Sequence, residues 1–197
     1  MGKEAQVTAT FADGADEGRL QLEPPRLVFR GARRRVWAGE ALAGVRAEGG
    51  DLVLADGSRL ALGEKAAANW AQAILRPKGR MEKIGVKPGM RVGVLGVDDP
   101  ALAADLAAAG AVAATELAAL DLLFYGADSA DELARIPELA PALAERGALW
   151  IVSRKGKAAT VRDVDVMAAA KAAGLVDNKV VSFSDTHTAL RFVRRRG

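Results

Sequence analysis

Residues 7–62 alternate between hydrophobic and polar positions in short runs. Glycine, aspartate and proline separate the runs, and Asp56-Gly57 is typical of a tight hairpin turn. An alternation of period two places every second side chain on the same face of a strand. The pattern therefore predicts an antiparallel meander of about seven short strands with one buried face. The runs cover residues 6–11, 19–23, 27–29, 36–37, 42–45, 51–54 and 59–62.

The pattern changes at residue 64, where a segment without glycine or proline begins. Pro77 and Gly79 mark its end. A bent sheet of short strands leaves an apolar end open, so we expect a helix over residues 64–75 to cover that end with Trp70. The apolar positions that share one helical face are Ala67, Trp70, Ala71, Ile74 and Leu75.

From residue 91 onward, apolar runs of strand length alternate with helix-like segments. This order predicts an open, mostly parallel sheet with helices on both faces. The last two strands are close in sequence and are expected to form an antiparallel hairpin at one edge. The expected strands cover 91–97, 122–125, 148–152, 179–183 and 189–193, and the clearest helices cover 101–109 and 163–173. A polar connector over 81–90 then divides the chain into domains 1–79 and 80–197.

Residues 5–77 resemble the pleckstrin-homology-like, or GRAM-like, superfold. The resemblance is one of topology and is carried by the segments 18–23 and 27–31 and by Leu62-Gly63 before the helix with Trp70. It implies an α+β barrel of about seven antiparallel strands closed by a C-terminal helix. Members of that superfold bind phosphoinositides, peptides or neighbouring domains, and the fold alone does not select among these ligands.

Residues 80–196 resemble an uncharacterised bacterial domain-of-unknown-function family with a class I methyltransferase-like Rossmann core. The segments 88–96, 121–125 and 147–152 are similar to the first, fourth and fifth strands of such methyltransferases, and 172–180 and 184–193 are the more specific matches. Residues 152–156 depart from the Trp-Pro-Lys-like end expected of the fifth strand. The resemblance implies a reduced α/β sheet and carries no established activity.

The composition narrows the chemistry that the chain can perform. There is no cysteine and one histidine, so thiolate catalysis is excluded and no metal site is expected. The formal charge of +3 is small, although Arg33-Arg34-Arg35 and Arg194-Arg195-Arg196 form two clusters. The first residues are polar and no apolar run has the length of a membrane span, so we expect a cytoplasmic protein.

Cofactor binding would depend on the turn after the first strand of the second domain. Gly93 and Gly96 could approach a nucleotide or S-adenosylmethionine, and Glu116 has the spacing of an acid that binds ribose. However, only residues 117–120 separate Glu116 from the strand that opens at Asp121. Parallel neighbours need a crossover of about a dozen residues. The units that build a ribose and adenine pocket are therefore expected to be reduced, and no cofactor is expected.

Arg154, Lys155 and Lys157 follow the carboxyl end of a strand, where open α/β sheets bind ligands. This loop is the best candidate for contact with a small anion. His187 with Asp185 is a candidate base with an orienting carboxylate, but no nucleophile accompanies the pair.

These features favour a non-catalytic binding or scaffold protein with a degenerate methyltransferase-like domain. Its barrel would dock on a partner protein or on its own second domain. The alternative is an S-adenosylmethionine- or nucleotide-binding enzyme or sensor that uses the Gly93–Gly96 turn and the 154–157 loop. A third reading, nucleic-acid binding through the arginine clusters, is disfavoured because aromatic residues for base stacking are scarce.

Overall fold

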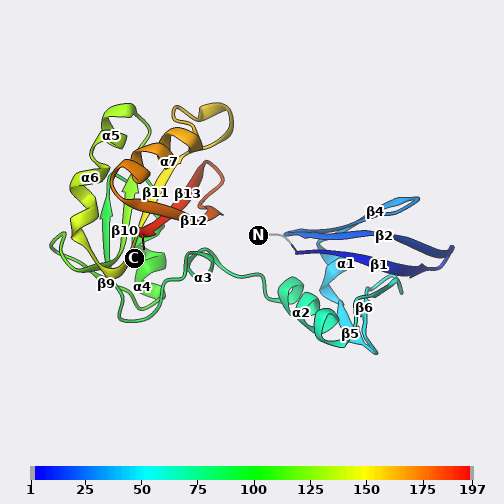
Figure 1. The fold of residues 1–197 in the computed structure, drawn as a ribbon. Coiled ribbons are helices and arrows are strands. Elements are labelled where there is room, and N and C mark those ends of the chain that lie inside the picture. Colours follow the sequence, from blue (N-terminus) through cyan, green and yellow to red (C-terminus); the bar gives the residue numbers. More distant parts are fainter. Residues whose placement is uncertain (1–2, 196–197) are drawn as a thin grey trace. The chain divides into compact units, whose positions relative to one another are not determined.

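A computed structural model of the chain describes residues 3–195. Contacts between Cα atoms divide the chain into two compact units, residues 1–78 and 79–197 (Figure 1). We call them the N-terminal and the C-terminal unit and describe each by itself. Arg196, the last member of the second arginine cluster, lies outside the described residues.

The N-terminal unit is a seven-stranded antiparallel sheet, bent into a half-barrel, with strand order β4-β3-β2-β1-β7-β6-β5. Its longest pair joins β1 and β2, which are in register from Lys3 opposite Leu22 to Phe11 opposite Gly14. The predicted antiparallel sheet is confirmed. The strands are β1 (Lys3–Phe11), β2 (Gly14–Glu23), β3 (Arg26–Arg30), β4 (Arg34–Ala38), β5 (Arg46–Glu48), β6 (Asp51–Val53) and β7 (Arg59–Ala61).

The inner face of this sheet holds a core that α2 (Glu64–Leu75) covers with Trp70. Phe11 packs edge-on against Phe29 and stacks on Trp37, with ring centroids 5.4 and 6.4 Å apart. The strand predicted over 42–45 is wrong, because α1 (Glu40–Ala43) forms there and β5 begins only at Arg46. One helical turn is sufficient to bury Leu42, the apolar residue that the strand was expected to bury.

The C-terminal unit is a mixed six-stranded sheet with order β12-β13-β11-β10-β8-β9. The strands β9, β8, β10 and β11 are parallel, and β13 pairs antiparallel with both β11 and β12. The expected parallel sheet with an edge hairpin is confirmed. The strands are β8 (Arg91–Leu95), β9 (Val112–Ala113), β10 (Leu120–Gly126), β11 (Leu143–Arg154), β12 (Leu175–Ser182) and β13 (His187–Arg194). The two-residue β9 agrees with the expectation that the chain is too short here for a full second strand.

Helices cover both faces of this sheet (Figure 1). On one face α3 and α4 pack over Phe124 and Trp150, and on the other α5, α6 and α7 pack over Leu123 and Leu149. The helices are α3 (Arg80–Ile84), α4 (Leu102–Ala108), α5 (Ala130–Ala134), α6 (Ile136–Leu139) and α7 (Asp163–Ala172), with 3₁₀ turns η1 (Ala140–Ala142) and η2 (Gly156–Ala158).

The expected connector over 81–90 contains α3, which sequence reasoning missed. The Glu82 side chain accepts a hydrogen bond from the Gly79 amide at 3.1 Å and so caps the helix start. Ile84 is buried against the sheet. A single turn with one buried anchor is too short to produce a clear helical pattern in the sequence. Among the described residues, no helix has both the length and the hydrophobicity needed to cross a membrane.

Candidate functional site

The carboxyl ends of β8 and β10 are where an open sheet of this type binds a ligand. Gly93 lies inside β8 and is buried, and a methyl group there would meet Leu120 at 2.8 Å and Leu123 at 3.1 Å. Gly96 follows β8 with a φ of 66°, a backbone conformation that favours glycine. Gly93 therefore serves packing within the sheet, and Gly96 serves the turn after it.

The backbones of Gly96 and Gly126 approach each other closely at this end of the sheet. A Cβ atom added to Gly126 would clash with the Gly96 carbonyl oxygen and would lie 2.6 Å from its carbonyl carbon and 3.1 Å from the Val97 nitrogen. β8 and β10 are neighbouring strands, and their ends approach so closely that position 126 has no room for a side chain.

Arg80 binds the loop that follows β8. Its guanidinium pairs with Asp99 in that loop and with Asp105 of α4, and it lies over the Phe183 ring at 4.9 Å. The Arg80 and Asp99 side chains are only 17% and 13% exposed. Burial alone would raise the pKa of Asp99, but the hydrogen bond and charge of Arg80 outweigh burial, so the pKa lies below its usual value. The pair fixes the loop through a partly buried ion pair.

Glu116 is exposed on the loop that joins β9 to β10. β9 pairs only with Arg91 and Val92, at the start of β8, and the Arg91 side chain donates to the Ala118 carbonyl at 3.4 Å. This loop therefore runs beside the first half of β8, whereas Gly96 follows its end. The structure does not bring Glu116 to the Gly96 turn.

The three basic residues of the 154–157 loop have different surroundings. The Arg154 side chain lies 3.6 Å from Asp128, and the Lys155 ammonium donates to the Ser182 hydroxyl at 2.8 Å and to the Ser184 carbonyl at 2.6 Å. Lys157 is exposed in η2. Lys155 is therefore held by hydrogen bonds within the protein, whereas Arg154 and Lys157 are both exposed to solvent.

His187 begins β13, and Asp185 lies in the preceding turn instead of on the strand. The ring Nδ1 of His187 lies 2.8 Å from the Thr186 hydroxyl and 3.5 Å from the Ser184 hydroxyl. Asp185 belongs to the hairpin turn, so β13 does not hold it on the same strand face as His187.

The first arginine cluster lies at the β3–β4 turn. Arg33 and Arg35 both bind Asp13 at 2.6 Å, and the Arg35 guanidinium lies 3.9 Å from the centre of the Phe11 ring. The hydrogen bond from Arg35 lowers the pKa of Asp13. In the second cluster, Arg194 donates to the backbone carbonyl of Leu143 at 2.9 Å. Arg33, Arg35 and Arg194 therefore already have protein partners.

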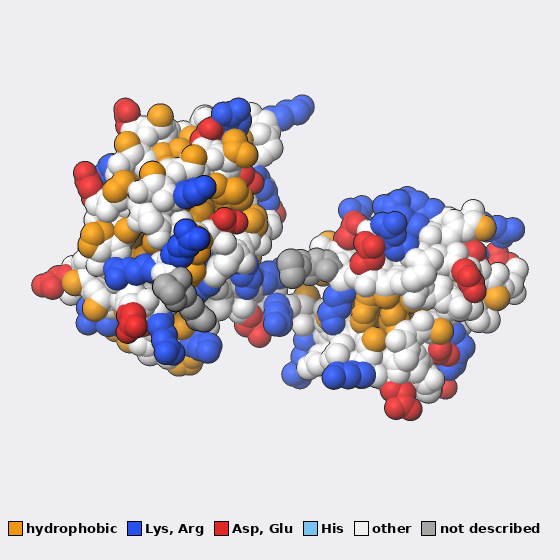
Figure 2. All heavy atoms as spheres, viewed as in Figure 1, with side chains coloured by type: hydrophobic (Ala, Val, Ile, Leu, Met, Phe, Trp, Pro, Cys, Tyr) orange, Lys and Arg blue, Asp and Glu red, His pale blue; other side chains and the backbone are white. Residues whose placement is uncertain are grey.

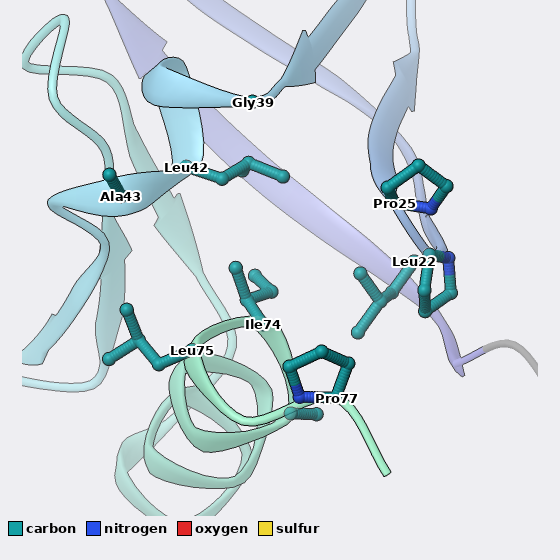
Figure 3. A pocket seen from close by; sticks show the side chains of 10 residues that line it. Leu22, Pro25, Gly39, Leu42, Ala43, Ile74, Leu75 and Pro77 are labelled. Atoms are coloured by element: carbon teal, nitrogen blue, oxygen red, sulfur yellow. The ribbon is translucent and has the colours of Figure 1, made fainter. Parts of the chain in front are cut away.

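A pocket of about 270 Å³ opens in the N-terminal unit (Figure 3). It lies between the end of α2, α1 and the turn that joins β2 to β3. Every lining residue is apolar or glycine, and three of them are prolines. The lining consists of Leu22, Pro24, Pro25, Gly39, Leu42, Ala43, Ala73, Ile74, Leu75 and Pro77.

Sequence reasoning missed this pocket because its walls come from segments far apart in the chain. One signal was available in the sequence: Leu75 ends the helix just before Pro77, and it stays 52% exposed in the structure. A large exposed apolar residue indicates a binding surface when it is part of a contiguous apolar patch, here formed with the neighbouring prolines.

Comparisons with solved structures find methyltransferases at low similarity. Magnesium protoporphyrin IX methyltransferase from Synechocystis PCC 6803 is 18% identical with a TM-score of 0.45, over 59% of this chain and 74% of that one. The ribosomal protein L11 methylase from Lactobacillus delbrueckii subsp. bulgaricus is 14% identical with a TM-score of 0.46, over 59% and 75%. A methyltransferase from Aquifex aeolicus is 14% identical with a TM-score of 0.46, over 57% and 86%. A search of curated proteins finds no match.

A comparison with protein families gives a match over residues 82–196, which is more than half of the chain and nearly all of the C-terminal unit. The matching family is described as a protein of unknown function, DUF3052. This chain belongs to the DUF3052 family.

Proposed function

We propose that this chain is a non-catalytic binding protein of the bacterial cytoplasm. Its N-terminal unit, a pleckstrin-homology-like barrel, holds an apolar side chain of a partner protein in the pocket between α1 and α2. Its C-terminal unit is a degenerate methyltransferase-like domain without a resident cofactor. The observation that carries the proposal is a pocket of about 270 Å³ whose lining side chains are all apolar.

The size and the chemistry of the pocket favour a protein side chain over a metabolite. Pockets for small molecules and cofactors measure about 300–1,000 Å³ and contain a few polar groups that orient the ligand. This pocket is smaller, and none of its lining side chains is polar. An apolar anchor in a well-shaped pocket is the usual centre of a protein–protein interface.

The short second strand of the C-terminal sheet supports the non-catalytic part of the proposal. β9 has only two residues, so the chain supplies little structure for a ribose and adenine pocket. Gly93 and Gly96 have roles in packing and in the turn after β8, and Glu116 is exposed on the loop between β9 and β10.

We expect isothermal titration calorimetry of the full chain with S-adenosylmethionine to give no binding heat, because the two-residue β9 leaves the chain without the units that build a ribose and adenine pocket. ATP and NAD as further ligands extend the test to common nucleotides. Saturable heat with any of these ligands, reduced by Gly96→Ala, would support the cofactor-binding alternative and overturn this part of the proposal.

A peptide selection tests the pocket directly. Peptides selected from a random displayed library on the full chain are expected to carry a bulky apolar anchor. Leu75→Asp is expected to weaken their binding at least about tenfold, because it places a charge in the anchor site. Leu75 is already 52% exposed, so this change leaves the fold intact.

The matched control is Val164→Asp, which introduces the same charge at a valine 60% exposed on α7. Fluorescence anisotropy of a labelled peptide measures both affinities. If every selected peptide binds the Leu75→Asp variant as tightly as the control variant, the proposal is contradicted.

A further inference from the structure

Three arginines lie directly opposite one another on the outer face of the N-terminal sheet. Arg19 of β2 faces Arg30 of β3, and Arg30 faces Arg34 of β4. All three are exposed. Directly opposed residues of adjacent strands project from the same face, so the three side chains form one row across the strands. Figure 2 shows Lys and Arg side chains gathered over this part of the unit.

This arginine row (Arg19, Arg30 and Arg34) has little compensating negative charge. Arg19 lies 3.5 Å from Glu4, and both side chains are more than half exposed. Arg30 donates to the neutral amide oxygen of Gln21 at 2.9 Å. Among the described residues, Arg34 has no carboxylate within 4.0 Å.

Like charges placed opposite one another destabilise a sheet. The neighbouring Arg33 and Arg35, in contrast, both bind the carboxylate of Asp13, which offsets part of their positive charge. The row therefore has an electrostatic cost that an external anionic partner would relieve.

We propose that the arginine row is a docking surface for an acidic helix of a partner protein. Adjacent strands lie about 4.8 Å apart, so the row presents a positive charge at about that interval. On a helix, side chains four residues apart are neighbours with Cβ atoms about 5–6 Å apart, so positions i, i+4 and i+8 form a row at that interval. Glutamates at these positions match the interval of the row, and each guanidinium offers two parallel donors to a carboxylate.

The surroundings of the row favour a protein partner over nucleic acid or a membrane. Phe11, Phe29, Trp37 and Trp70 are all buried in the core, which leaves no aromatic ring of the described N-terminal unit for stacking on bases. Val36, 43% exposed, is the large apolar residue beside the row, in register with Val28. One valine gives an acidic helix a small apolar contact and is too little to insert into a bilayer.

Binding to defined probes tests this surface on the full chain. The probe is an alanine-rich helical peptide with three glutamates at i, i+4 and i+8, which share one face of the helix. Its control is a peptide of the same composition with the three glutamates at i, i+5 and i+10, which lie on different faces of the helix. Arg30→Gln/Arg34→Gln is expected to weaken binding of the first peptide about tenfold. Arg46→Gln/Arg146→Gln removes the same charge at two exposed arginines, one on β5 at the opposite edge of the sheet and one in the C-terminal unit, and is expected to leave binding unchanged.

Three results would overturn the proposal. One is equal binding of the two peptides, which removes the role of helical spacing. The second is an equal loss with the control variant. The third is tighter binding of the chain to duplex DNA or to vesicles of anionic lipid than to the helical peptide, when that binding is also weakened by Arg30→Gln/Arg34→Gln. Leu75→Asp in the apolar pocket leaves this binding unchanged, so the arginine row and the pocket are tested separately.

Discussion

Replacing Gly126 with alanine is expected to destabilise the C-terminal unit by about 3 kcal/mol. The added methyl group would lie 2.6 Å from the Gly96 carbonyl carbon, inside the backbone of the turn that follows β8. Backbone atoms cannot move aside as a flexible side chain can, so β8 and β10 would have to separate. Urea unfolding followed through NMR signals of β10 and β11 measures the change in the C-terminal unit alone.

The control for this substitution is Gly156→Ala in η2. Gly156 has a φ of 68°, and no atom lies within 4 Å of the added methyl group. Its expected cost is about 1 kcal/mol, from backbone conformation alone. Similar costs for the two variants would show that the ends of β8 and β10 have room between them and would contradict the tight backbone contact at Gly126.

Replacing Arg80 with alanine is expected to cost about 2 kcal/mol, because it leaves Asp99 mostly buried without its partner. The variant also loses the pair with Asp105 and the contact with the Phe183 ring. Arg162→Ala is the matched control: Arg162 binds Asp165 at 2.8 Å but is 79% exposed, so its loss is expected to cost less than about 0.5 kcal/mol.

The effect of Arg80→Ala is also expected to depend on pH. The pKa of Asp99 in the folded protein lies below the unfolded value of about 3.9. The stability from the ionised carboxylate is therefore present above pH about 4 and is lost as pH falls through the lower folded pKa. Urea unfolding at neutral pH and at pH about 3 measures, at each pH, how much less stable the Arg80→Ala variant is than the unsubstituted protein. A loss that is equal at the two pH values would contradict a role for the Asp99 charge.

Much of the N-terminal sheet was predictable because a half-buried strand repeats every two residues. The run at residues 6–11 alternates in sequence and in burial alike. The exception is α1, where Leu42 is the only fully buried residue of the helix. One buried position fits a strand or a helical turn equally well, and packing against the rest of the core decides between them.

The C-terminal unit was predictable from longer signals. The helix expected over residues 163–173 is α7 in the structure. The short chain between Glu116 and Asp121 indicated a reduced second strand, and β9 has only two residues. Helix α3 was missed because its contacts lie far away in sequence: Arg80 binds Asp99 and Asp105. No local pattern encodes an ion pair across such a separation.

The candidate sites were less predictable than the fold. Sequence motifs pointed to Gly93, Gly96 and the basic loop at 154–157 as candidate sites. Glycines and basic residues of this kind occur in cofactor sites and in ordinary turns alike. The pocket combines Leu22, Leu42 and Ile74 from three separate elements, and only the folded chain brings them together. The arginine row likewise depends on strand register, which the sequence alone does not specify.

A methyl NMR titration of the full chain with a selected peptide tests the central proposal most directly. We expect the methyl signals of Leu22, Leu42 and Ile74, which line the pocket, to shift on binding. We expect the methyl signals of Leu102 and Leu106, on the buried face of α4 in the C-terminal unit, to stay in place. Shifts confined to the C-terminal methyl groups, with the pocket signals unchanged, would contradict it.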